Sequence, residues 1–161
     1  MRKLLLIILC LFFLGAGNNP DTFGTATSDP GTTWFSDDNI LVDDGNLAST
    51  LTNGGYIELY AWNRFEIPYQ ATIKGMELMI ECNISSNCTV GRSNATIAVS
   101  NDNGTTYSST KTTGVIKNSL VVYTLGQSGD KWNESVNWSS EVFNNQASFR
   151  IQVTANKVGV T

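Results

Sequence analysis

The chain contains no histidine, which removes several kinds of active site from consideration. Histidine is the usual general base near neutral pH, the usual partner of a serine or cysteine nucleophile, and a common ligand of zinc. Basic residues are also scarce, ten against fourteen acidic ones, and they form no cluster and no basic amphipathic helix. Because nucleic-acid binding depends on neutralising phosphates with Lys and Arg, we expect no nucleic-acid partner.

A long hydrophobic run is missing as well. The longest, Leu4–Leu14, has eleven residues, whereas a membrane-spanning helix needs about 20. It follows Arg2-Lys3 and precedes Gly15-Ala16-Gly17, which is the order of a cleavable export signal. The alternative is an uncleaved anchor, and the shortness of the run argues against it. We expect residues 1–17 to be a signal peptide and residues 18–161 to be a secreted or surface-exposed domain without a membrane span. Its net charge is then −6 instead of −4, since two basic residues leave with the signal.

Only three cysteines are present, and Cys10 lies within the expected signal. Cys82 and Cys88 remain, an even pair in a chain bound for an oxidising compartment. They would close a loop of five residues, and such a bridge would stabilise the fold by roughly 2 kcal/mol. We predict this disulfide. Two free thiols, or a buried Cys82 beside an exposed Cys88, are the alternatives.

The stretch from Tyr56 to Cys82 alternates apolar and polar residues with a period of two. Such alternation is typical of strands with one face on a core. Ile57 and Leu59 share the apolar face of the first strand, which is expected to end at Pro68, because proline lacks the N–H that a strand ladder needs. Met76, Leu78, Ile80 and Cys82 share one face of the second strand.

Three further strands follow the same reasoning. Residues 95–99 and 149–154 alternate, whereas 121–125 has apolar residues on both faces, which favours a central position in a sheet. A short helical turn is expected at 139–143. Val158 and Val160 have the spacing of another strand, which suggests a truncated sequence. Many short strands joined by turns predict an all-β fold, an antiparallel β-sandwich of jelly-roll type in a single domain.

Four aspartates surround a short apolar run between residues 37 and 44. They are Asp37, Asp38, Asp43 and Asp44. Clustered carboxylates suit Ca²⁺, which takes six to eight oxygen ligands. The spacing differs from that of an EF-hand loop, and aspartate also forms turns by bonding its own backbone. The cluster therefore predicts either a structural calcium site or two turns that flank a strand.

Residues 100–107, Ser-Asn-Asp-Asn-Gly-Thr-Thr-Tyr, resemble the Asp-box, with Tyr107 in the place of the usual tryptophan. The resemblance implies a tight hairpin stabilised by Asp102 and Gly104, with the aromatic ring packed beneath it. The motif recurs in sialidase propellers, but here it occurs once and no arginine cluster accompanies it. We therefore expect the hairpin without sialidase activity.

Tyr56, Tyr60 and Trp62 lie on the strand face opposite Ile57 and Leu59. A row of aromatic rings on a strand can stack on sugars, so these three residues are the candidate ligand-binding site. The alternative is that a loop or the N-terminal segment covers the row. Glu58, Glu66, Glu77 and Glu81 are present for a glycosidase mechanism, which needs only two carboxylates. We interpret these glutamates as solvated strand residues, and we expect that the protein is not an enzyme.

Three segments together resemble a β-sandwich module of phage-encoded and bacterial surface proteins. They are Trp34 with 43–48, then 65–78, and then Trp132, Trp138, 142–144 and 149–151. Asp44-Gly45-Asn46 with 56–59 and 73–75 is more loosely similar to galactose-binding-like jelly rolls, which implies a structural Ca²⁺ and sugar binding. These resemblances rest on fold-determining residues and bring no catalytic motif. The expectation is thus a non-catalytic module that binds carbohydrate or a cell-surface ligand. A self-assembling part of an appendage or virion is the alternative, and a glycoside-active enzyme is third.

Overall fold

The computed structural model describes residues 9–11, 25–28, 34–36, 48–50, 52–61, 65, 67–84, 93–132, 138–145 and 148–158. Its elements in chain order are β1 (Leu9–Leu11), β2 (Thr25–Ser28), β3 (Trp34–Phe35), β4 (Ser49–Thr50), β5 (Gly55–Tyr60), β6 (Glu77–Cys82), β7 (Asn94–Ser100), β8 (Lys111–Thr112), β9 (Val121–Gly126), α1 (Ser140–Asn144) and β10 (Arg150–Asn156).

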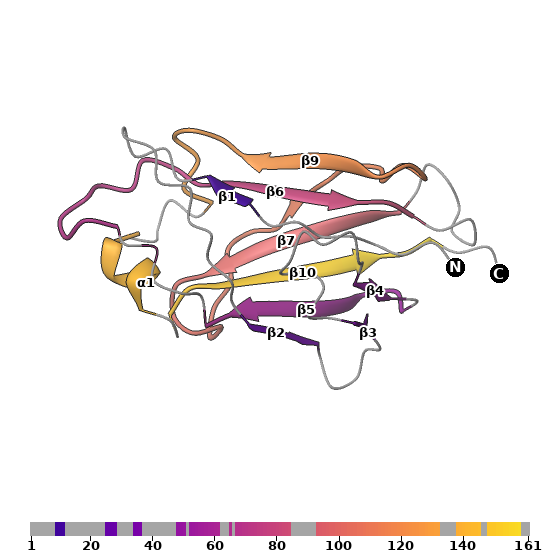
Figure 1. Ribbon diagram of the computed structural model, residues 1–161, viewed down its shortest axis with the longest axis horizontal. Helices are drawn as coiled ribbons and strands as arrows, with labels where there is room; N and C mark the ends of the chain where they lie inside the picture. The colour runs from indigo at the N-terminus through magenta and orange to yellow at the C-terminus, as the bar shows by residue number, and fades with distance from the viewer. Residues whose placement is uncertain are drawn as a thin grey trace.

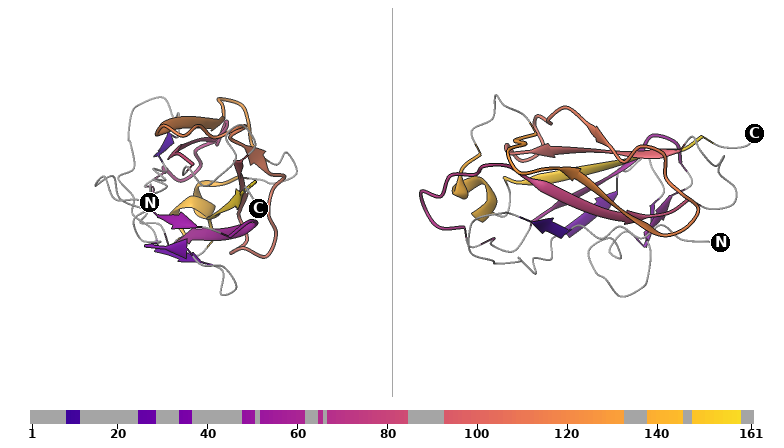
Figure 2. Two further views of the ribbon diagram at one scale, coloured as in Figure 1. Left: turned by 90° about the vertical axis from the view of Figure 1, so that its right-hand side faces the viewer. Right: turned by 90° about the horizontal axis from the view of Figure 1, so that it is seen from above.

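The strands form an all-β antiparallel sandwich, as the sequence predicts. A five-stranded sheet has the order β2-β5-β10-β7-β8, a three-stranded sheet has the order β1-β6-β9, and β3 pairs with β4. In the end-on view the orange β9 lies on one side of the molecule and the purple β2 and β5 on the opposite side (Figure 2). No helix in the described ranges is long and apolar enough to cross a membrane.

Alternating strands supply the core, and the predicted inward positions are confirmed. Ile57 and Leu59 of β5 are fully buried, as are Ile97 of β7 and Ile151 of β10. From the three-stranded sheet, Leu78, Ile80 and Cys82 of β6 point inward. All of these residues belong to one hydrophobic cluster. The core therefore lies between the two sheets and leaves the alternate residues for the outer faces.

Four aromatic rings close one end of this core. Phe65, Trp138, Phe143 and Phe149 pack with ring centroids 4.9–6.1 Å apart. Short helix α1, predicted within one residue of its observed start, contributes Phe143. Asn144, the last residue of α1, holds the segment around Ile67, because its side-chain amide accepts from the N–H of Ile67 and donates to the carbonyl of Ile67, at 3.1 and 2.8 Å. The amide thus replaces the strand neighbour that this segment would otherwise need.

The first predicted strand is shorter than expected. It ends at Tyr60, and Ala61 adopts a φ of 55°, a left-handed conformation that interrupts a strand. The expectation that Pro68 terminates it was wrong. Pro68 instead begins a turn in which the N–H of Ala71 donates to the carbonyl of Pro68 at 3.0 Å.

The position predicted for residues 121–125 was also wrong. They form β9, which pairs with β6 and lies at the margin of the three-stranded sheet (Figure 1). The inward face carries buried Leu125, but Val122 is 50% exposed and Leu120, just before the strand, is 43% exposed. The apolar residues on the second face of this segment are therefore exposed on the surface and not buried in the core.

A glycine contact fixes the turn that follows β9. Gly126 has a φ of 80°, and a side chain there would place its Cβ 2.3 Å from the carbonyl oxygen of Met76. The same carbonyl accepts a hydrogen bond of 3.0 Å from the indole N–H of Trp132. The turn 127–130 is thereby held against the start of β6.

Candidate functional site

The outer face of the five-stranded sheet contains the predicted aromatic row. Tyr56, Glu58 and Tyr60 alternate on β5 and are half-buried, which confirms that they face away from Ile57 and Leu59. The register places Tyr56 beside Thr154 of β10, Thr154 beside Thr96 of β7, and Thr96 beside Thr112 of β8. Neighbouring strands lie about 4.8 Å apart. We call Tyr56, Thr154, Thr96 and Thr112 the hydroxyl row, since it brings one hydroxyl from each of four adjacent strands to the same face.

Two amides extend this row along β10 and β7. Asn156 pairs with Asn94 in the strand register. The Nδ2 of Asn156 donates to the Oδ1 of Asn94 at 2.9 Å and to the hydroxyl of Thr96 at 3.2 Å. Both amides are half-buried. This end of the outer face is thus polar and hydrogen-bonded. None of its residues from β5, β10, β7 or β8 is charged, because Lys111 of β8 pairs with the inward-facing Ile97 and not with the hydroxyl row.

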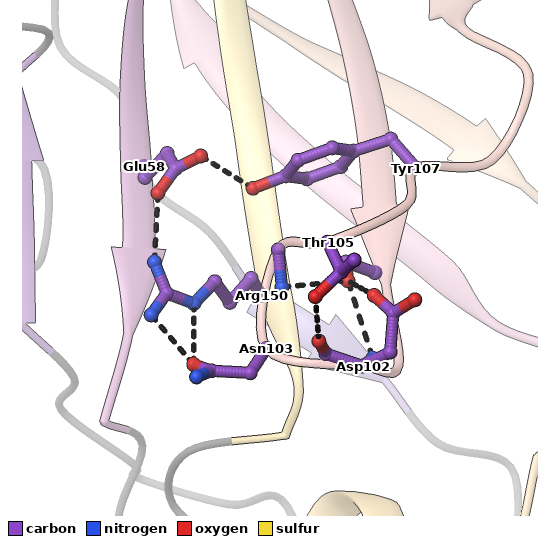
Figure 3. A network of polar contacts seen from close by, with 8 residues as sticks. Glu58, Asp102, Asn103, Thr105, Tyr107 and Arg150 are labelled. Atoms are coloured by element: carbon purple, nitrogen blue, oxygen red, sulfur yellow. Dashed lines mark hydrogen bonds and ion pairs between the residues drawn. The ribbon is translucent and has the colours of Figure 1, made fainter.

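The other end of the face is organised around Glu58. Its Oε1 accepts a hydrogen bond of 2.5 Å from the hydroxyl of Tyr107, and its Oε2 lies 2.8 Å from the Nη1 of Arg150 (Figure 3). Arg150 also donates from Nε and Nη2 to the Oδ1 of Asn103, at 3.0 and 2.6 Å. We call Glu58, Arg150, Tyr107 and Asn103 the Glu58 network. Both oxygens of its carboxylate are engaged.

Arg150 also covers part of the predicted aromatic row. Its guanidinium carbon lies 4.7 Å from the centroid of the Tyr60 ring, the geometry of a cation–π contact. A sugar cannot stack on the ring face that the guanidinium occupies. Trp62, the third member of the row, lies outside the described residues, and its role stays a prediction. Part of the Tyr60 ring is therefore not available to a ligand.

The hairpin predicted from the Asp-box resemblance is confirmed, and it holds Tyr107 and Asn103 in the Glu58 network. The carboxylate of Asp102 accepts from the N–H and the hydroxyl of Thr106 at 2.9 and 2.7 Å. The hydroxyl of Ser100 donates to Asp102 at 2.7 Å and accepts from the N–H of Gly104 at 2.9 Å. Asn103 and Gly104 have φ values of 61° and 79°, which a tight turn requires.

Two pKa shifts follow from these contacts. Hydrogen bonds from the Thr106 side chain and backbone, then from Ser100, lower the pKa of the Asp102 carboxyl to about 2. They do so because they stabilise its charged form. Burial, followed by the hydrogen bond to Glu58, raises the pKa of the Tyr107 hydroxyl above its ordinary value. Asp102 is therefore charged and Tyr107 is a neutral donor throughout the neutral range.

The remaining predicted sites are only partly described. Asp37, Asp38, Asp43 and Asp44 lie outside the described residues, so the calcium site stays a prediction. Within the described ranges no group of three or more Cys, Asp or Glu is placed to hold a metal ion. Cys82 carries a free thiol that is fully buried. Burial and then the charge of Glu81 raise its pKa to about 12. Cys88 lies outside the described residues; the thiol of Cys82 is free in the structure, whereas the sequence predicts its bridge to Cys88.

Sequence reasoning placed Glu58 and Arg150 on outward strand positions but did not bring them together. Thr96, Thr112 and Thr154 were not predicted as site residues, since the order of strands in a sheet is not visible in one sequence. Tyr107 was expected to pack under the hairpin, but its partner Glu58 was not expected. No protein-family model, curated protein or solved structure matches this chain.

Proposed function

We propose that the chain is an exported, non-catalytic β-sandwich module that binds carbohydrate on the outer face of its five-stranded sheet. The observation that carries the proposal is the hydroxyl row, in which Tyr56, Thr154, Thr96 and Thr112 occupy adjacent strands in register. The export signal expected in residues 1–17 supports a location where such a ligand is met.

The chemistry of the row suits a neutral sugar. A sugar ring presents hydroxyls that both donate and accept, and each threonine or tyrosine hydroxyl also donates and accepts. The amides of Asn94 and Asn156 add donors and acceptors at the same end of the face. Tyr56, at the β5 end of the row, supplies an aromatic ring whose apolar body can contact the C–H face of a sugar. An acidic sugar is a poorer fit, because Arg150 is already engaged by Glu58 and Asn103.

The state of the carboxylates favours binding over hydrolysis. Glycoside hydrolysis needs two carboxyl groups about 5–9.5 Å apart, one on each side of the scissile bond. Glu58 has both oxygens occupied by Tyr107 and Arg150. Glu77 and Glu81 belong to β6, in the other sheet. Glu66 lies outside the described residues.

Retention on immobilised polysaccharides and a glycan array test the proposal. The double variant Thr96→Val/Thr154→Val removes two hydroxyls from the row while keeping β-branched side chains that suit a strand. Thr72→Val is the control, because Thr72 is an exposed threonine that lies outside both the five-stranded sheet and β9. We expect wild type and control to be retained alike, and the double variant to lose roughly tenfold or more in affinity. Wild type that binds no glycan, or equal losses in both variants, would contradict the proposal.

A further inference from the structure

β9 has a backbone edge that no other described strand covers. It pairs with β6 on one side, from Cys82↔Val121 to Glu77↔Gly126. On its other side no backbone hydrogen bond joins it to any part of the chain that the structure describes. Figure 1 shows β9 along the upper margin of the molecule. An unpaired strand edge presents a row of N–H and C=O groups that can template another strand.

The other sheet edges are protected in ways that β9 is not. Natural edge strands are commonly short, or they carry lysine, other charges or proline nearby. β8 has two residues and contains Lys111, which forms an ion pair of 2.6 Å with Asp130. β2 has four residues and is followed directly by Asp29-Pro30. β6, whose other edge is beside β1, contains Glu77 and Glu81.

β9 has none of these protections. Residues 118–129 contain no charge and no proline, although a run of twelve residues in a chain with 15% charged residues would be expected to carry about two charges. Val122 is 50% exposed and Leu120 is 43% exposed, so apolar surface borders the open edge. Such a strand on the surface is either a hazard for aggregation or a site of pairing.

We infer that β9 is the contact through which two copies of this chain pair, edge to edge and antiparallel, about a two-fold axis. An edge strand is complementary to itself in this arrangement, because each copy offers the same donors and acceptors in reversed order. The net charge, −4 for the full chain and −6 without the expected signal, makes two copies repel. The electrostatic repulsion between two copies is therefore smallest where the contacting segments carry no charge. β9 and its flanking residues 118–129 meet this condition. The pairing joins the β6 and β9 strands of both copies into one continuous sheet.

This pairing does not depend on carbohydrate binding, but it would change its strength. The hydroxyl row lies on the five-stranded sheet, whereas β9 belongs to the other sheet. Both copies would keep that face uncovered by the contact. A dimer would then present two binding faces, and linked sites raise the apparent affinity for a repeating ligand.

Sedimentation velocity over a range of concentrations tests the inference with two matched variants. Val122→Lys places a like charge beside its counterpart at the proposed contact, whereas Val158→Lys introduces the same charge at an exposed valine that follows β10, in the other sheet. We expect wild type and Val158→Lys to dimerise alike, and Val122→Lys to raise the dissociation constant roughly tenfold or more. A monomeric wild type, or equal weakening by both substitutions, would overturn the inference.

Hydrogen exchange provides a second readout that does not depend on the folding of a variant. In wild type, the amides of residues 121–125 that do not bond to β6 should become more protected as the protein concentration rises. Amides of β8, which forms the edge of the other sheet, should not change. A dimer whose formation leaves exchange in β9 unaltered would use another surface and would refute the pairing.

Discussion

Arg150 lies 2.8 Å from Glu58, although 92 residues separate them in the chain. The pair joins β10 to β5, and through Asn103 and Tyr107 it also joins the sheet to the hairpin of residues 100–107. Arg150 thus connects β10, β5 and the hairpin at this end of the outer face. The hydroxyl row lies at the other end of the same face, on strands that are paired in register.

Replacing Arg150 tests the importance of this pair for stability. Arg150→Ala removes the ion pair, the bonds to Asn103 and the contact with Tyr60, and it leaves Glu58 short of a partner. We expect a loss of about 2 kcal/mol in the free energy of unfolding, measured with urea. Arg150→Lys should lose less stability than Arg150→Ala, because lysine keeps the positive charge. It should still be less stable than wild type, because lysine lacks the planar set of donors that arginine has. Lys74→Ala, at an exposed position, is the control. An Arg150→Ala variant as stable as this control would contradict the assignment.

Asp102 predicts a specific dependence of stability on pH. Its pKa is about 2 in the folded chain against an ordinary value of 3.8, so the ionised carboxylate favours the folded state. That contribution is complete above about pH 4 and is lost as the pH falls towards 2. Wild type should therefore be more stable than Asp102→Asn at pH 5, and the difference should shrink between pH 4 and pH 2. Urea unfolding across this range measures it. A difference that stays constant would show that the hairpin does not lower this pKa.

The thiol of Cys82 should react very slowly in the folded protein. It is fully buried and its pKa is raised to about 12, so little reactive thiolate exists at pH 8 and none is accessible. Alkylation followed by mass spectrometry should label Cys82 only after unfolding. Rapid labelling of folded protein would contradict the buried position. A mass lower by two hydrogens before reduction would instead establish the predicted bridge to Cys88.

The predicted export signal overlaps a strand. β1 pairs with β6 in the register Leu9↔Met79 to Leu11↔Glu77, yet it falls within residues 1–17. We expect exported protein to lack these residues and to keep its cooperative melt, because β1 contributes only three residues. N-terminal sequencing and thermal unfolding test this together. Exported protein that begins at Met1 would contradict the signal assignment, and β1 would then be part of the mature fold.

Alternation within single strands was sufficient to predict most of the fold. The inward positions of β5, β6, β7 and β10 follow directly from a period of two, because burial of one face dominates those segments. The end of β5 was not predicted, since nothing in the local pattern shows that Ala61 adopts a left-handed conformation. The edge position of β9 was also missed, because apolar residues on both faces suit either a central strand or an open surface.

The candidate site was less predictable than the fold for a physical reason. It is formed across strands, and the neighbours of a strand depend on the topology of the whole sheet rather than on the local pattern. Thr154 gains its importance from lying beside Tyr56 in register, and Thr96 from lying beside Thr154. Arg150 covers Tyr60 from a different strand. The pattern of β5 alone therefore placed Tyr56 and Tyr60 on the outer face but could not show that Arg150 covers part of the Tyr60 ring.

The most direct test of carbohydrate binding is an NMR titration of the chain with the neutral oligosaccharide that it retains best on the array. Amide resonances should be followed for both sheets. We expect saturable shifts at Tyr56, Thr96 and Thr154, with little change at Met79 and Thr124 on the other sheet. Shifts confined to β6 and β9, or no saturable shift with any oligosaccharide, would contradict the assignment of the binding face.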